Sequence, residues 1–259
     1  MTVLTLAWPV AVHAQTSAEK IVTAIVRADY EGDRMALDRL YDELKAVRPA
    51  EGNRRQAAQL HYWLGFAKWR RSINGFNVNA DQVELEADLR TAVSEFDASH
   101  AADPAFTDAG VATLGCLQNL MYIYRNDRTR SGEVVQRFLA LFKEMSQADP
   151  NNPRLAWLDG GGKFYMAQFA PAEEQAKQQA AGMETYRRGL ENARKQKRAA
   201  STLEPTWGEP ELLMSLAWTS LNQAKPDVAA AEKYANEALA LVPHWHYVKN
   251  ILMAQIKAR

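Results

Sequence analysis

The stretch LEADLRTAVSEFDASHAADP, residues 85–104, decides the fold of this chain. Its side chains Ala92, Phe96 and Ser99 fall on one face of a helix, and the helix is expected to stop at Asp103-Pro104. A similar stop signal, in which a proline ends an apolar helical stretch, recurs along the chain. It is found at Val47-Arg48-Pro49, Ala148-Asp149-Pro150, Leu203-Glu204-Pro205 and Leu241-Val242-Pro243. A stop signal that returns in this way indicates a chain built from repeated helical units.

The spacing of residues 85–104, small-x3-aromatic-x2-small-x4-Pro, resembles the second half of a tetratricopeptide (TPR) repeat, a two-helix unit of about 34 residues. Residues 229–243, AAAEKYANEALALVP, match it best, at positions Ala231, Tyr234, Ala238, Leu239 and Pro243. Most of the intervals between the terminating prolines are much longer than the standard unit, so the repeats are extended. The resemblance implies a right-handed α-solenoid in which the first helices of successive pairs line a concave groove.

The composition supports an all-helical globular protein and excludes strong charge-driven binding. The chain has 259 residues, of which 47% are apolar and 24% are charged. Residues that favour helices are plentiful. Lys plus Arg and Asp plus Glu are both 31, so no net field attracts nucleic acid or an anionic membrane surface. We expect an all-α fold, no nucleic-acid partner and no membrane span.

The N-terminal residues 1–14 are predicted to be a signal peptide. Residues 3–12 form an apolar run, and Val12-His13-Ala14 is a small-x-small cleavage site. The run is shorter than the about 20 residues that a membrane-spanning helix needs. The alternative is a buried first helix, against which Pro9 argues. We therefore expect a periplasmic or secreted protein whose TPR-like domain covers residues 15–259.

The apolar periodicity predicts about five helix pairs followed by a C-terminal capping helix. The second pair is expected to contain a helix at 58–72, an inserted polar loop at 73–82 and the helix that ends at Pro104. The main non-periodic linker is AASTLEPTWGEPE, residues 199–211. Residues 244–258 are predicted to form the final helix, since a solenoid needs a cap over its last apolar face.

The predicted partner-binding wall lies on the first helices of the pairs. With Leu64-Gly65 as the register of the repeat, Tyr62, Phe66, Trp69 and Arg70 lie at i, i+4, i+7 and i+8 on the groove side. The same wall is expected to continue through four residues of the later pairs: Leu158, Tyr165, Leu212 and Leu216. Aromatic side chains with an arginine suit an extended peptide or an apolar ligand. The alternative is that these aromatics fill the core or contact the inserted loop.

Other motifs carry weaker signals. The run 159–163, DGGGK, lacks the hydroxyl residue and the preceding strand of a phosphate-binding loop, and close helix packing explains at least Gly161. His244 and His246 are two residues apart and point to different faces of a helix, without further zinc ligands in view. The basic residues of 187–198 are read as a solvated helix face or as a docking surface for an acidic partner. The single cysteine, Cys116, is expected to be a buried small hydrophobe.

These observations predict a non-catalytic protein without a cofactor or a metal. Nucleophile elbows, Ser/His/Asp arrangements and paired catalytic carboxylates are not recognised in the sequence. The function we expect is a scaffold or adaptor that binds a segment of a partner protein in the concave groove. The alternative is an accessory component of an envelope uptake system that encloses a small apolar ligand with the same aromatic side chains.

Overall fold

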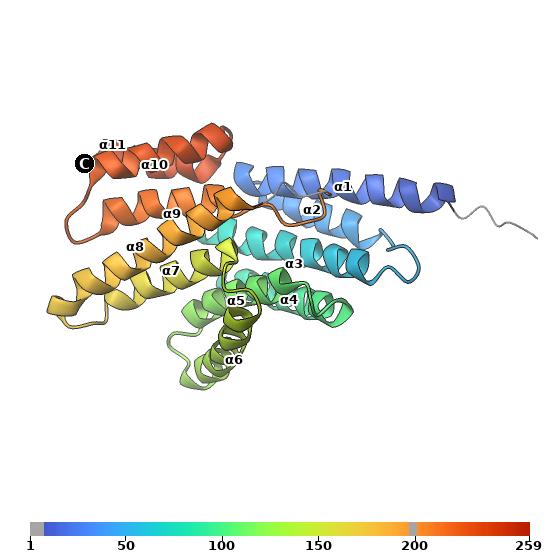
Figure 1. Cartoon of the computed structure of the whole chain (residues 1–259), viewed down its shortest axis with the longest axis horizontal. Helices are drawn as coiled ribbons and strands as arrows, with labels where there is room; N and C mark the ends of the chain where they lie inside the picture. The colour runs from blue at the N-terminus through green and yellow to red at the C-terminus, as the bar shows by residue number, and fades with distance from the viewer. Residues whose placement is uncertain (1–7, 197–200) are drawn as a thin grey trace, which may run out of the picture. The chain divides into compact units, whose positions relative to one another are not determined.

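The computed structural model describes residues 8–196 and 201–259, and within them the chain is all-helical (Figure 1). The expected all-α class is therefore confirmed. The elements are α1 Trp8–Glu31, α2 Arg34–Lys45, α3 Arg54–Asn77, α4 Gln82–Ala102, α5 Thr107–Ile123, α6 Arg128–Ala148, α7 Pro153–Ala167, α8 Ala172–Lys195, α9 Glu209–Asn222, α10 Val228–Leu241, the π-helix η1 Tyr247–Leu252 and α11 Met253–Lys257.

The described chain divides into two compact units. Unit 1 consists of residues 8–29, 33–140 and 201–205, and unit 2 consists of residues 30–32, 141–196 and 206–259. Helices α1 to α10 follow the predicted order along the chain, and extensive contact joins the predicted pairs α3–α4, α7–α8 and α9–α10. The predicted final helix is divided into two elements, η1 and α11. The division arises because the first part has the wider π-helical turn.

The N-terminal prediction is only partly covered by the structure. Residues 1–7 of the predicted signal peptide lie outside the described residues, and residues 8–14 belong to α1, which continues without a break to Glu31. Within the part of the chain that the structure describes, none of the helices combines the length and the apolar character that crossing a membrane requires.

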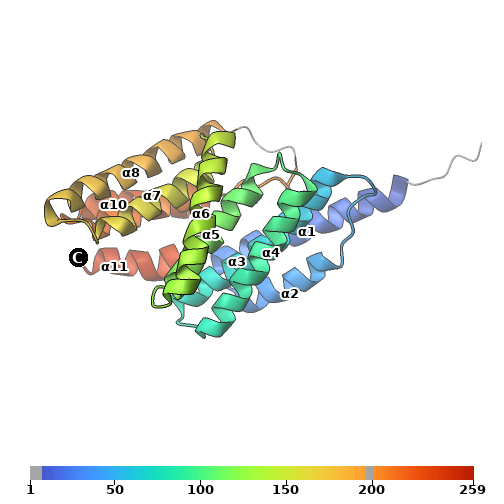
Figure 2. The same ribbon diagram turned by 90° about the horizontal axis from the view of Figure 1, so that it is seen from below.

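Helix α3 is the centre of unit 1. Helices α2 and α4 pack against it, and α5 packs against both α4 and α3 (Figure 2). Gly65 of α3 lies in close contact with α4, because a Cβ atom there would lie 2.8 Å from the ring of Phe96. Gly115 of α5 makes a similar close approach to the indole ring of Trp69. Cys116, the next residue, is fully buried as expected.

The inserted loop predicted at 73–82 is wrong for most of its length. Helix α3 continues to Asn77 and α4 begins at Gln82, with Asp81 as its N-cap. The reason is tertiary packing at Gly75, where an added Cβ atom would lie less than 3.0 Å from the side chain of Leu85. The close contact of α3 with α4 overrides the low helix propensity of glycine and asparagine in this stretch.

In unit 2, α7 and α8 form an antiparallel pair, α9 packs against both of them, and α10 packs against α9 (Figure 1). Residues 159–163 lie inside α7, so the glycine run is helix and not a loop. Gly160 is packed more closely than Gly161, where an added Cβ atom would lie 3.1 Å from the hydroxyl of Tyr186. A Cβ atom at Gly160 would lie 3.0 Å from the carbonyl oxygen of Gly182 on α8 and 2.7 Å from the ring of Tyr186.

Candidate functional site

The predicted wall residues of α3 lie in the core of unit 1. Tyr62, Phe66 and Trp69 are each at most 1% exposed. The ring of Tyr62 lies 5.6 Å from that of Phe96 on α4 and 5.3 Å from that of Phe106, which precedes α5. Trp69 lies 6.3 Å from Phe96. These aromatic rings pack against one another, as the core alternative predicts.

Arg70, the charged member of the predicted wall, is also buried. Its Nε donates to Asp29 Oδ2 on α1 at 2.7 Å, and both side chains are at most 5% exposed. Asn74 Nδ2 donates to the other carboxylate oxygen of Asp29 at 3.1 Å. Because breaking a buried ion pair leaves an uncompensated charge in the core, this pair fixes α1 to α3.

The four predicted wall residues of unit 2 do not share one environment. Leu158, Leu212 and Leu216 are buried, whereas Tyr165 is 49% exposed. Tyr165 lies near the C-terminal end of α7, and its ring contacts that of Phe169 at 5.6 Å. Phe169 is exposed too, as is Met166 between them. Of the eight predicted wall residues, Tyr165 is therefore the one that presents a large apolar surface to solvent.

A different stripe of α3 contacts a distant part of unit 1. Arg55, Gln59 and Trp63 lie at i, i+4 and i+8, and all three bind the segment 201–205, Ser-Thr-Leu-Glu-Pro. Trp63 Nε1 donates to the carbonyl oxygen of Leu203 at 2.8 Å. The indole N–H of a buried tryptophan generally needs such a partner. The stripe is offset from the predicted one, with Trp63 in place of Tyr62.

The acidic residue of the segment is held by two side chains of α3. Arg55 Nη2 donates to Glu204 Oε2 at 2.8 Å, and Arg55 Nε donates to Oε1 at 3.3 Å. Gln59 Nε2 adds a hydrogen bond to Oε1 at 2.8 Å. This is the two-pronged geometry in which a guanidinium group recognises a carboxylate. The side chains of Arg55 and Glu204 remain 41% and 34% exposed, so water screens the pair and it contributes about 0–1 kcal/mol.

Residues outside the segment hold Arg55 in place. Arg55 Nη1 donates to Asp103 Oδ2 at 3.2 Å, and the guanidinium group lies 4.1 Å from the centre of the Phe106 ring. Partial burial alone would lower the pKa of Arg55, but the hydrogen bonds and charges of Glu204 and Asp103 raise it above its ordinary value. The arginine is therefore oriented by the helix framework as well as by the segment.

The segment itself forms a compact turn. Ser201 Oγ accepts a hydrogen bond from the Leu203 amide at 3.1 Å, and the Glu204 amide donates to the Ser201 carbonyl at 3.1 Å. Ser201 Oγ also donates to Glu19 Oε1 on α1 at 3.1 Å. The side chains of Leu203 and Pro205 are buried. One face of the turn thus presents a leucine, a carbonyl oxygen and a carboxylate to α1 and α3.

A second polar cluster lies on α2, α3 and α4. Glu95 Oε1 accepts from the Tyr41 hydroxyl at 3.0 Å, and Glu95 Oε2 lies 2.7 Å from His61 Nδ1. Burial alone would raise the pKa of Glu95, but the hydrogen bonds from His61 and Tyr41 outweigh it and lower that pKa. Burial, with the nearby charge of Glu95, raises the pKa of Tyr41. The arrangement orients the imidazole ring and stabilises the carboxylate.

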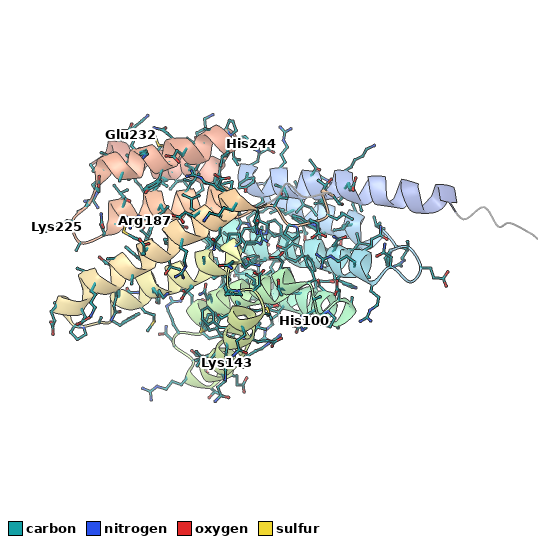
Figure 3. All side chains as sticks on the ribbon, in the orientation of Figure 1. His100, Lys143, Arg187, Lys225, Glu232 and His244 are labelled. Atoms are coloured by element: carbon teal, nitrogen blue, oxygen red, sulfur yellow. The ribbon has the colours of Figure 1, made fainter. Side chains whose placement is uncertain are left out.

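The remaining sequence motifs lie on the surface of unit 2 (Figure 3). Arg187 of α8 and His244 after α10 are both solvent-exposed. In the basic stretch 187–198, whose last two residues lie outside the described residues, Arg194 forms ion pairs with Glu209 at 2.9 Å and Glu237 at 3.0 Å, as on a solvated helix face. Within residues 8–196 and 201–259, groups of three or more His, Cys, Asp or Glu side chains placed to hold a metal ion are absent.

Sequence reasoning missed the α3 stripe of Arg55, Gln59 and Trp63. Tyr62 and Trp63 are adjacent and both aromatic, so either could begin a stripe at helical spacing, and the prediction began at Tyr62. The linker 199–211 gave no signal for this contact, because a single leucine such as Leu203 is common on protein surfaces. Comparison with protein-family models, with curated proteins and with solved structures finds no match to this chain.

Proposed function

We propose that this protein is a non-catalytic, TPR-like scaffold that binds a segment of a partner protein on the surface of its helix pairs. The observation that carries the proposal is the contact of α3 with residues 201–205. Arg55, Gln59 and Trp63 already bind a non-helical segment through its backbone and its side chains. Recognition of a short segment by one face of a helical framework is the activity that the proposed scaffold needs.

The helix packing within each unit supports the TPR-like part of the proposal. In unit 1 the first helices of the second and third pairs, α3 and α5, contact each other, and in unit 2 the first helices α7 and α9 do the same. Contacts between the first helices of neighbouring pairs are expected where pairs stack side by side. Within each unit, stacking of this kind places the first helices of two pairs side by side.

Site-specific photo-crosslinking tests the proposed function. A photo-reactive phenylalanine analogue is placed at Arg54, an exposed residue in the first turn of α3 next to Arg55. The matched control carries the same analogue at Arg39, which is exposed on α2 in the same unit. We expect position 54, and not position 39, to crosslink one reproducible protein in the cells that make this chain. Identical crosslinks from both positions, or none from position 54, would contradict the proposal.

A further inference from the structure

We infer that the α1–α3 surface of unit 1 recognises a specific turn motif, Ser-x-Leu-Glu-Pro, and that residues 201–205 occupy this surface as an internal ligand. A partner segment of the same chemistry would bind by displacing them. The inference rests on the proposed function and goes beyond it in naming the ligand and the competitor.

The contacts define what a ligand must provide. Trp63 Nε1 requires a carbonyl acceptor, which Leu203 supplies at 2.8 Å. Arg55 and Gln59 require a carboxylate one residue later, which Glu204 supplies. The leucine side chain supplies the buried apolar contact, since Leu203 is 2% exposed. A neutral or basic residue at the carboxylate position would leave Arg55 without that partner, which gives the surface its selectivity.

The surface is formed largely by residues that do not belong to the segment. Asp103 and Phe106 orient Arg55 independently of Glu204. Trp63 is held by its neighbours in the core, with its ring 5.3 Å from that of Tyr62 and 5.0 Å from that of Phe66. A surface that keeps its shape without its ligand binds with a smaller ordering cost. A segment from another protein could therefore bind Arg55 and Trp63 in the same positions.

The ion pair and hydrogen bonds that hold residues 201–205 on α3 can be replaced by equivalent bonds from another segment. The Glu204 carboxylate and the Arg55 guanidinium group remain partly exposed, so water competes for both. The segment is a turn with two local hydrogen bonds and not part of a helix. Because it is covalently attached, its effective concentration is on the order of millimolar, and a free peptide must compete with it.

Peptide binding to the full chain tests the inference. The probe is a fluorescein-labelled synthetic peptide with the sequence of residues 199–206, AASTLEPT, and binding is followed by fluorescence anisotropy. In the variant L203A/E204A the internal segment is weakened while α1 and α3 are unchanged. We expect this variant to bind the peptide at least about tenfold more tightly than the original chain, because the tethered competitor is lost. The matched control is T202A, which alters an exposed side chain of the same segment and should bind as the original chain does.

Two further measurements assign the binding to the named residues. Adding R55A to L203A/E204A should weaken peptide binding by about twofold to fivefold, as should a peptide in which lysine replaces the glutamate, because the ion pair is partly exposed. If L203A/E204A loses its helical circular-dichroism signal, E204Q replaces it, since that change removes the charge and keeps the leucine. Equal affinity of the original and segment-weakened chains, or binding that R55A leaves unchanged, would overturn the inference.

The two proposals can fail separately. A partner that crosslinks at position 54 together with a peptide that does not bind would leave the scaffold function standing and refute the internal-ligand motif. Peptide binding that behaves as expected, with no partner crosslinked from the original or the segment-weakened chain, would refute the scaffold function and leave the motif standing.

Discussion

Gly115→Ala is expected to destabilise unit 1 by overpacking its core. A Cβ atom at this position would lie less than 3.0 Å from two carbons of the Trp69 indole ring. Ordinary carbon–carbon contacts lie at about 3.5–4.0 Å, so either the ring or α5 must move. The ring has little room, because it is fully buried and lies 6.2 Å from Phe66 and 6.3 Å from Phe96. Its Nε1 also donates to Asn119 Oδ1 at 3.0 Å.

The change in the free energy of unfolding follows from two destabilising effects and one stabilising effect. Overpacking a well-packed core costs about 1–3 kcal/mol. A shift of the ring that breaks its hydrogen bond to Asn119 would cost about 1 kcal/mol more. Alanine in place of glycine in a helix interior returns about 0.5–1 kcal/mol. The free energy of unfolding should therefore fall by about 1–3 kcal/mol in Gly115→Ala.

Gly132→Ala is the matched control. Gly132 lies inside α6 in the same unit, and a Cβ atom there would have no neighbour within 4 Å. The same change of residue should then raise the free energy of unfolding by about 0.5–1 kcal/mol. Urea unfolding followed by far-UV circular dichroism measures both variants against the original chain. The reasoning is refuted if Gly115→Ala is as stable as the original chain, or if Gly132→Ala loses as much stability as Gly115→Ala.

Two other predictions concern charge and surface. The pKa of Glu95 is lowered from its ordinary value of 4.5 by the hydrogen bonds from His61 and Tyr41, against the effect of burial. Because the folded-state pKa is the lower one, Glu95 stabilises the fold above about pH 4.5, and this is lost as the pH falls through the folded-state value. Glu95→Gln should flatten the acid side of the melting temperature plotted against pH, and an unchanged acid side would contradict this. The double variant Tyr165→Ser, Phe169→Ser removes exposed rings and should change the free energy of unfolding by less than about 1 kcal/mol in urea; a larger loss would show that these rings are needed for folding.

The sequence predicted the helices well because their signals are local. Apolar side chains at helical spacing and proline stops identified most of the helices along the chain. The loop at 73–82 was wrong because its glycine and asparagines are read locally as helix breakers, while Gly75 serves a tertiary contact with Leu85. The local sequence does not show which side chain of another helix will pack against a glycine.

The partner-binding wall was harder to predict because α3 is covered on more than one face. Adjacent residues on a helix point about 100° apart, so Tyr62 and Trp63 lie on different faces although both are aromatic. Helical spacing alone selects a stripe, and it does not say whether that stripe meets a neighbouring helix or another segment. Burial of Tyr62, Phe66 and Trp69 against Phe96 assigns their stripe to the core.

The α3 stripe of Arg55, Gln59 and Trp63 depends on contacts between residues far apart in the sequence. Trp63 bonds to Leu203 and Arg55 bonds to Glu204, in each case more than a hundred positions later in the chain. The chemistry of the stripe nevertheless limits what can bind there. A segment that buries Trp63 must offer an acceptor to its indole N–H, and a segment that covers Arg55 must offset its positive charge beyond what Asp103 already supplies. Any partner that replaces residues 201–205 must meet both requirements, and most segments that supply only a leucine would bind this surface less tightly than the chain's own turn.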